Sequence, residues 1–367
     1  MDPGLIRHPL AVHTLYAELQ QACFDAQAQE PTGRPFDAVG AVSAMSKHIR
    51  GRTYWYAQYL DAVGRRRQVY LGPQGDGTPQ GDGPTERTVA RLTDPERVGM
   101  LEHRRSLVRT LRSAGFTTLD ATASRALTFL ERVRLFRAGA AVVGTPAYHA
   151  LLAQQGFSER VPVQTEDFGI QVDRLALALP GPAALAALAR DWHPDAFPVP
   201  TMNRKSAFAS LKIRGHTFRL DFLIAGHIGN TGRVVAIPQL NFGAQALAFL
   251  DYLTADAQPG LILSSTGTIA PLPQPGRFVW HKCAVAAARP PAWAAKRAKD
   301  LRQARTLFAV LQETDPDQLL EAAAQIDTAR EGAALRARVI KTLQAEELSA
   351  LRECLEQASS SRRAGPR

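Results

Sequence analysis

Cysteine and long apolar runs are what this sequence has least of. Its 367 residues include three cysteines, Cys23, Cys283 and Cys354, which are odd in number and far apart. That spacing excludes a disulfide framework or a cysteine metal cluster and is typical of a reducing compartment. No stretch reaches the roughly 18 consecutive apolar residues that a membrane-spanning helix needs. Because the first residues are polar and broken by prolines, unlike a secretory signal, we expect a cytoplasmic protein with no membrane partner.

Acidic side chains are also few. There are 34 Asp and Glu residues against 44 Lys and Arg, which gives a formal net charge of +10. Such a balance favours polyanionic partners, either nucleic acids or the phosphates of nucleotides. Chains rich in arginine and alanine also arise from GC-rich coding sequences, however, so the charge alone does not decide between these interpretations.

The chain divides into segments of different pattern. Residues 1–83 contain a helical stretch and an aromatic β-hairpin, and residues 84–137 carry apolar side chains at helical spacing. Short apolar runs mixed with helical ones over 138–275 indicate an α+β domain, a mixed sheet flanked by helices. Helical patterns dominate 276–358, which we expect to form a C-terminal helical domain, and we expect 359–367 to be a disordered tail.

A strand followed by Gly-Thr and a helix is the first pattern with chemical meaning. The sequence AAVVG (140–144) predicts a short buried strand, and Gly144 permits a sharp turn because it has no Cβ. Thr145 adds a hydroxyl beside the first free amides of a helix that begins near Pro146. Helix N-termini of this kind accept phosphate oxygens. The alternative, a plain strand–helix turn, is common for Gly-Thr alone.

Two aspartates lie in later apolar segments. Asp167 occurs in TEDFGIQV, and Asp221 lies among apolar neighbours in FRLDFLI. A carboxylate in such surroundings is costly unless it is paired or binds a metal. Two carboxylates on adjacent strands, opposite a phosphate-binding turn, form an oxygen-ligand site for Mg²⁺ or Mn²⁺. The alternative is a salt bridge from Asp221 to Arg214 or Arg219.

The order of these motifs resembles the nucleotidyltransferase fold related to DNA polymerase β. More specifically, the chain is similar to bacterial nucleotidyltransferase-like proteins with the pattern VGTxA, a helix, TxDID and later LDFL. In that group a basic aromatic hairpin precedes the domain, and two basic motifs follow it. Here these are Arg50–Tyr56, His281–Lys282 and Lys296–Ala304, so the resemblance covers residues 45–315 through the order of five short motifs.

The resemblance implies a nucleoside triphosphate (NTP) as substrate and transfer of its nucleoside monophosphate to an acceptor. The acceptor is left open among RNA, a protein hydroxyl and a small molecule, and the basic charge favours RNA. The resemblance further implies that Gly144 and Thr145 bind the phosphates of the nucleotide. It implies that Asp167 and Asp221 are the catalytic carboxylates and hold Mg²⁺. It places two basic residues near the triphosphate or the acceptor, Lys282 and Lys299.

One position departs from the pattern of this group. Gly169 stands where the group has its second metal-binding aspartate. A two-metal phosphoryl transfer needs several negative oxygens to hold its ions, so the loss of one carboxylate weakens metal binding. The alternative function is therefore a catalytically inactive protein that binds nucleotides or nucleic acids on the same fold. A toxin-like component of a two-component system is a third expectation.

The aromatic hairpin has two interpretations of its own. Tyr54, Trp55, Tyr56 and Tyr59 are interleaved with arginines, as in platforms that stack bases and bind phosphates. Alternation puts Tyr54 and Tyr56 on one face of the strand and Trp55 on the other. At least one of the two faces is expected to be core.

Overall fold

The structure is a computed structural model of the chain. It describes residues 4–29, 43–60, 66–74, 84–132, 135–159, 167–171, 195–199, 208–215, 217–237, 242–346 and 348–363. The α+β class is confirmed, because helices and strands are mixed through most of the described chain and helices alone follow residue 275. None of the described helices is long and apolar enough to cross a membrane.

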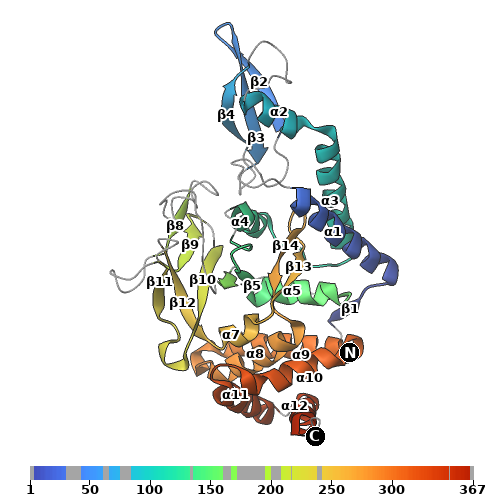
Figure 1. Cartoon of the computed structure of the whole chain (residues 1–367), viewed down its shortest axis with the longest axis vertical. Helices are drawn as coiled ribbons and strands as arrows, with labels where there is room; N and C mark the ends of the chain where they lie inside the picture. The colour runs from blue at the N-terminus through green and yellow to red at the C-terminus, as the bar shows by residue number, and fades with distance from the viewer. Residues whose placement is uncertain are drawn as a thin grey trace.

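A three-stranded antiparallel sheet forms one end of the molecule (Figure 1). Its strands, in spatial order, are β2 (Ser43–Ile49), β3 (Arg52–Leu60) and β4 (Arg66–Pro73). The predicted aromatic hairpin corresponds to β3 and β4. The strand β2 was not expected, because its sequence SAMSKHI has little apolar alternation of its own. It pairs with β3 along its whole length, from Ser43 opposite Gln58 to Ile49 opposite Arg52.

Among the described residues up to 132 there are four helices. Two of them begin at aspartate caps: the Asp94 carboxylate accepts from the Glu96 amide at 3.1 Å, and Asp120 accepts from the amides of Thr122 and Ala123. These caps fix the starts of the third and fourth helices. The four are α1 (Leu10–Gln29), α2 (Pro84–Thr93), α3 (Pro95–Ser113) and α4 (Ala121–Arg132).

The central sheet is built around one strand, β10 (Arg219–Gly226). On one edge β10 pairs in parallel with β7 (Asp167–Gln171), and β7 pairs antiparallel with β5 (Ala141–Val143). The other edge is shared: β9 (Ser210–Ile213) pairs with the first half of β10, and β12 (Phe242–Ala248) with the second half. The outer strands are β8 (Ala196–Pro198), next to β9, and β11 (Val234–Ile237), next to β12.

Two small two-stranded sheets and short helices connect this sheet to the rest of the molecule. The helix α5 (Gly144–Gln154) follows β5 directly. The pairs are β1 (Leu5–Arg7) with β6 (Phe157–Glu159), and β13 (Gln258–Ile262) with β14 (Thr268–Leu272). The remaining short elements are α7 (Leu250–Thr254), η1 (Ile228–Asn230), η3 (Pro291–Trp293) and η4 (Ile326–Thr328).

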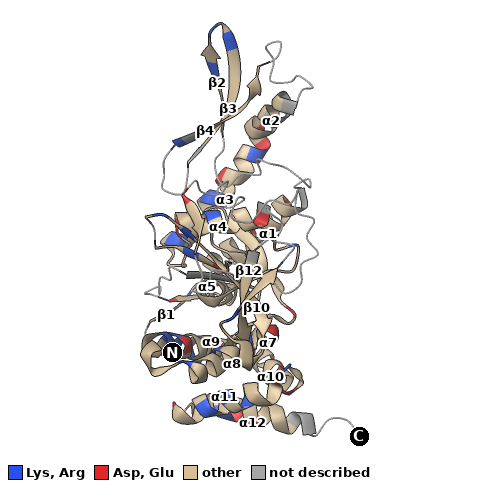
Figure 2. Cartoon of the chain, turned by 90° about the vertical axis from the view of Figure 1, so that its left-hand side faces the viewer, with Lys and Arg blue, Asp and Glu red and all other residues tan. Residues whose placement is uncertain are grey.

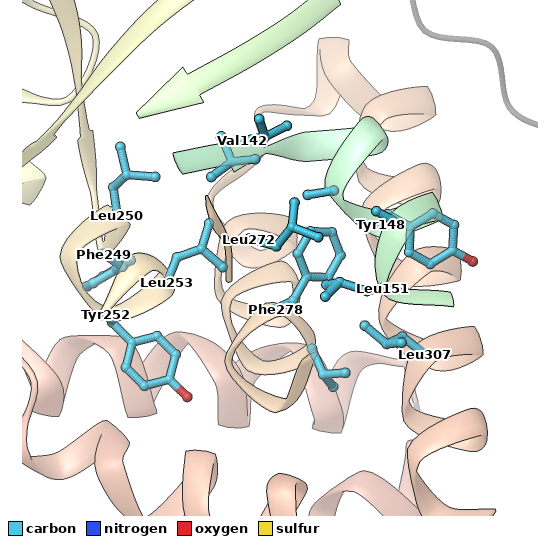
Figure 3. Packing of buried hydrophobic residues seen from close by; sticks show 14 of the residues in the cluster. Val142, Tyr148, Leu151, Phe249, Leu250, Tyr252, Leu253, Leu272, Phe278 and Leu307 are labelled. Atoms are coloured by element: carbon cyan, nitrogen blue, oxygen red, sulfur yellow. The ribbon is translucent and has the colours of Figure 1, made fainter. Parts of the chain in front are cut away.

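Five C-terminal helices pack below α5 (Figure 1). One apolar core joins them to the central sheet: Tyr148 of α5 stacks on Phe278 of α8 at 6.1 Å between ring centroids, and Leu307 of α9 lies nearby (Figure 3). The helices are α8 (Pro275–Ala288), α9 (Ala294–Thr314), α10 (Pro316–Gln325), α11 (Gly332–Ala345) and α12 (Ser349–Arg363).

The end of α12 differs from the sequence prediction. Residues 359–363, expected to begin a disordered tail, form the last turn of α12, and 364–367 lie outside the described residues. The helix continues because its apolar stripe Leu351, Leu355 and Ala358 is buried. Ser359 is also fixed, since its hydroxyl donates to the Leu355 carbonyl and accepts from Arg336.

Candidate functional site

The turn from β5 into α5 has the form that the sequence predicts. Gly144 has a φ of 74°, in the left-handed region that favours glycine, and a Cβ there would meet nothing within 4 Å. The space that such a Cβ would occupy is therefore open, whereas Thr145, the next residue, is buried. The residue before the helix is Val143, which has no polar side-chain atom and so cannot cap the first amides of α5. Those amides point toward the N-terminal end of the helix, where the helix dipole attracts anions.

The register of the sheet brings this turn next to the two aspartates. Gly169 of β7 lies between two partners, Val143 of β5 on one side and Asp221 of β10 on the other. Asp167 lies opposite Arg219, two residues before Asp221. Directly paired positions share a face of the sheet, and so do positions two apart on a strand. Positions 167, 169 and 221 therefore lie on the same face, at the strand end that leads into α5.

The Asp221 carboxylate is engaged by two polar neighbours. It accepts from Arg219 Nε at 2.5 Å and from the Ser210 hydroxyl, and Arg219 also donates to that hydroxyl at 2.8 Å. The salt bridge considered from the sequence is thus made by Arg219. The Asp221 side chain remains 19% exposed. The carboxylate is therefore partly accessible to solvent.

Helix α9 runs alongside α5 in the same direction. The Gln303 amide donates to the Thr145 hydroxyl at 3.4 Å, and near the other end of α9 Glu313 pairs with Arg7 of β1, the strand that pairs with β6 just after α5. Residues one turn before Gln303 therefore lie beyond the N-terminus of α5, by roughly 5 Å at the helical rise. Lys299 and Asp300 occupy that turn, on the face of α9 that Gln303 shares.

Lys282 of α8 reaches the same turn through an ion pair. Its Nζ donates to Asp300 at 2.7 Å, and Arg289 donates to the other carboxylate oxygen at 3.0 Å. Burial alone would raise the pKa of the Asp300 carboxyl, but the two cations outweigh it and hold that pKa below its ordinary value. Lys299 is half-buried beside this cluster. Lys282 and Lys299 thus both lie at the turn of α9 that precedes Gln303, Lys299 by sequence and Lys282 through its ion pair with Asp300.

His281 is buried beside this cluster. Neither of its ring nitrogens has a hydrogen-bond partner among the described residues. Burial, together with the neighbouring charges of Lys282 and Arg289, lowers the pKa of His281 to about 3. The imidazole is therefore neutral in the folded protein at any physiological pH.

The burial of His281 predicts an acid-labile fold. The unfolded chain protonates this residue below about pH 6.5, whereas the folded protein does so only near its own lowered pKa, so stability falls as the pH decreases between the two. From about pH 6.5 to about pH 4.5 we expect a loss of about 2 kcal/mol in the free energy of unfolding. Urea denaturation at both pH values measures it. His281→Leu should remove most of this pH dependence, and an unchanged slope in that variant would contradict the assignment.

Several residues near the site were not anticipated from the sequence. Gln303 and Ser210 contact Thr145 and Asp221 only because helices and strands far apart in sequence are neighbours. Trp293, between α8 and α9, is 49% exposed and lies under the cations of Arg289 and Lys296. The sequence signal for this group was a tryptophan flanked by basic residues at helical spacing.

The carboxylate positions fit one divalent ion better than two. Among the described residues no group of three His, Cys, Asp or Glu side chains forms a metal site. Strand spacing and rise put the Cα atoms of positions 167 and 221 roughly 8 Å apart. Mg²⁺ in proteins is usually held by only one or two carboxylates, so a pair of acids at this backbone separation would suffice for a single ion. A second ion would need a further carboxylate at position 169, and Gly169 supplies none.

Comparison with known proteins gives one result. A family model described as "Nucleotidyltransferase" matches residues 121–327, more than half of the chain. The match begins at α4 and ends in η4, so it contains every candidate site residue from Gly144 to Lys299 and excludes the β2–β3–β4 sheet. No curated protein and no solved structure matches the chain.

Proposed function

The chain belongs to this nucleotidyltransferase family, and we propose that it transfers a nucleoside monophosphate from an NTP to an acceptor at the face shared by β5, β7 and β10. The observation that carries the proposal is the strand register. Val143 is paired with Gly169, and Gly169 with Asp221, so the Gly144–Thr145 turn adjoins the carboxylate positions. A phosphate chain held at the turn has its reacting phosphorus near those carboxylates.

The proposed roles follow from these positions. The free amides at the start of α5 and the Thr145 hydroxyl hold phosphate oxygens, with Lys299 and Lys282 neutralising the charge of the triphosphate. An acceptor oxygen then bonds to the α-phosphorus and the bond from that phosphorus to the bridging oxygen breaks, which releases pyrophosphate. Asp221 orients the acceptor and takes its proton.

Mg²⁺ is the proposed cofactor, with Asp167 and Asp221 as its protein ligands. When bound, it supplies Lewis-acid stabilisation of the charge that develops on the phosphoryl oxygens. As a ligand, Asp221 would give up part of its contact with Arg219. The Ser210 hydroxyl, which donates to the same carboxylate, would hold the side chain in its orientation.

A catalytically inactive nucleotide-binding protein is the second candidate. Two observations favour it: Gly169 supplies no carboxylate opposite Asp221, and Arg219 already neutralises that aspartate. Such a protein retains the phosphate-binding turn and its lysines without transferring a nucleotide. In both cases the three cysteines, all free thiols, fit a protein of the reducing cytoplasm.

Label transfer from α-³²P-labelled NTPs tests the function. The full chain is incubated with each NTP and either short RNA or no added acceptor, in Mg²⁺ and in EDTA. We expect label in product with Mg²⁺ and none after chelation, because the phosphate charge is then uncompensated. NTP binding by filter assay without label transfer to RNA or to the protein itself would instead favour the second candidate. Neither binding nor transfer would contradict both.

A further inference from the structure

The two faces of the β2–β3–β4 sheet have different surroundings. On one face α2 packs against the strands: Ala57 of β3 and Val89 of α2 have no exposed surface, and Leu92 is 6% exposed. The Thr85 hydroxyl of α2 donates to the Leu71 carbonyl at 3.1 Å. This is the core face that alternation required, and Trp55 belongs to it.

The opposite face carries Tyr54, Tyr56 and Tyr70 and is partly exposed to solvent. Tyr70 is 54% exposed, and its ring lies 6.0 Å from that of Tyr54 and 5.6 Å from that of Tyr56. Lys47 Nζ lies 4.8 Å from the centre of the Tyr56 ring and donates to the Gln68 amide oxygen at 2.5 Å. We call this surface the tyrosine face and define it by Lys47, Tyr54, Tyr56, Gln68 and Tyr70.

The charge around the tyrosine face is mostly positive. Residues 43–73 contain six Lys and Arg residues and one Asp. Figure 2 shows Lys and Arg at the tip of the β2–β3 hairpin, where Arg50 and Arg52 are both exposed. Aromatic rings provide stacking surfaces for bases, cations attract phosphates, and amides such as that of Gln68 hydrogen-bond base edges.

We propose that the tyrosine face binds a single-stranded polynucleotide. A duplex does not present unstacked bases to exposed rings, whereas a single strand does. A protein partner is less favoured, because the tyrosine face has cations and amides where a protein interface has an apolar centre. The sheet also lies outside the residues that match the nucleotidyltransferase family. The proposal therefore stands without nucleotidyl transfer, although it would supply a polynucleotide acceptor if transfer occurs.

The hairpin tip gives independent support. Arg50 has a φ of 50° and Gly51 a φ of 78°, with Ile49 paired to Arg52, which is a two-residue turn with both central residues in the left-handed region. The first central position of such turns favours asparagine or glycine, and an arginine there lowers stability. Attraction of phosphates by its charge would explain why an exposed arginine occupies this position.

Fluorescence anisotropy with a labelled single strand of about 12 nucleotides tests the proposal, at a length that suits one small binding surface. The full chain, without any NTP, is titrated with oligo-U RNA, with the corresponding DNA, and with an RNA duplex. We expect both single strands to bind, or RNA alone if ribose is recognised, and the duplex to bind more weakly. Tyr70→Ala should weaken binding about ten-fold through loss of one stacked base, whereas Tyr70→Phe should retain it.

Two charge variants complete the test. Arg50→Asn suits the turn better than arginine, so unfolding cannot explain a loss of binding; it should lower the salt slope of log K by about 0.7. Lys47→Gln should have a similar effect, and Lys341→Gln, an exposed lysine of α11, should have none. The proposal is overturned if no single strand binds, if the duplex binds as tightly and Tyr70→Ala is without effect, or if Lys341→Gln matches Lys47→Gln.

Discussion

Replacing Asp221 by asparagine is expected to lower the rate of nucleotidyl transfer by about two to three powers of ten, since the charge stabilisation lost at a metal site is several kcal/mol. Asparagine keeps the size of the side chain and can still accept the Ser210 hydrogen bond, but it loses the negative charge. Single-turnover label transfer at saturating NTP measures the effect. Asp94→Asn is the matched control, because asparagine caps α3 as well as aspartate does.

Gly169→Asp is the complementary change at the same site. It adds a carboxylate directly opposite Asp221, so we expect transfer to reach half its maximal rate at a lower Mg²⁺ concentration. Gln171→Asp lies on the same strand and face but opposite Leu223, and it should leave the Mg²⁺ dependence unchanged. If Gly169→Asp transfers label and the wild type does not, the natural protein is a nucleotide-binding protein. If Asp221→Asn retains full activity, the proposed site is wrong.

Replacing Asp300 by asparagine is expected to lower the free energy of unfolding by about 3 kcal/mol. The Asp300 side chain is 5% exposed and is shared by Lys282, at 12%, and Arg289, at 24%. Without the carboxylate two cations remain in a mostly buried position with no counter-ion, and their desolvation is no longer offset. Urea denaturation at neutral pH measures the change.

A surface pair provides the control for Asp300. Glu356 binds Arg352 one turn away on α12 with both side chains 62% exposed, so Glu356→Gln should have no measurable effect on stability. The same Asp300→Asn protein separates structure from function, because its unpaired Lys282 should bind the triphosphate of an NTP more tightly. A stability loss no larger than that of Glu356→Gln would mean that water already solvates the cluster.

Local patterns predicted most of what depends on local sequence. Helical spacing predicted α1 and the helical character of residues 84–132, although not the break between α2 and α3 at Asp94. The Gly144 turn follows from the need for a residue without a Cβ. Elements and contacts that depend on residues distant in sequence could not be predicted. The strand β2 forms because it pairs with the edge of β3. The Gln303–Thr145 contact forms because α9 lies along α5. From the sequence both Arg214 and Arg219 were candidate partners of Asp221, and only the fold selects Arg219.

The charge cluster at the start of α9 shows where a local pattern is ambiguous. The motif KRAKDLRQAR (296–305) has basic residues at helical spacing, which is typical of a solvated helix face and also of one that lines a cleft. Asp300 is nevertheless buried, and Gln303 has no exposed surface. Helical periodicity cannot distinguish a polar face in water from one packed on another helix. The deciding information is that α8 and α5 lie on this side of α9.

The position of Gly169 opposite Asp221 also has a genetic consequence. Every glycine codon becomes a codon for aspartate or glutamate through one G-to-A transition at its second base. A single transition can therefore introduce an acid across the strand pair from Asp221, and the reverse change removes it. Descendants of one gene can thus gain or lose the third acid by point mutation alone, without any rearrangement of the sheet.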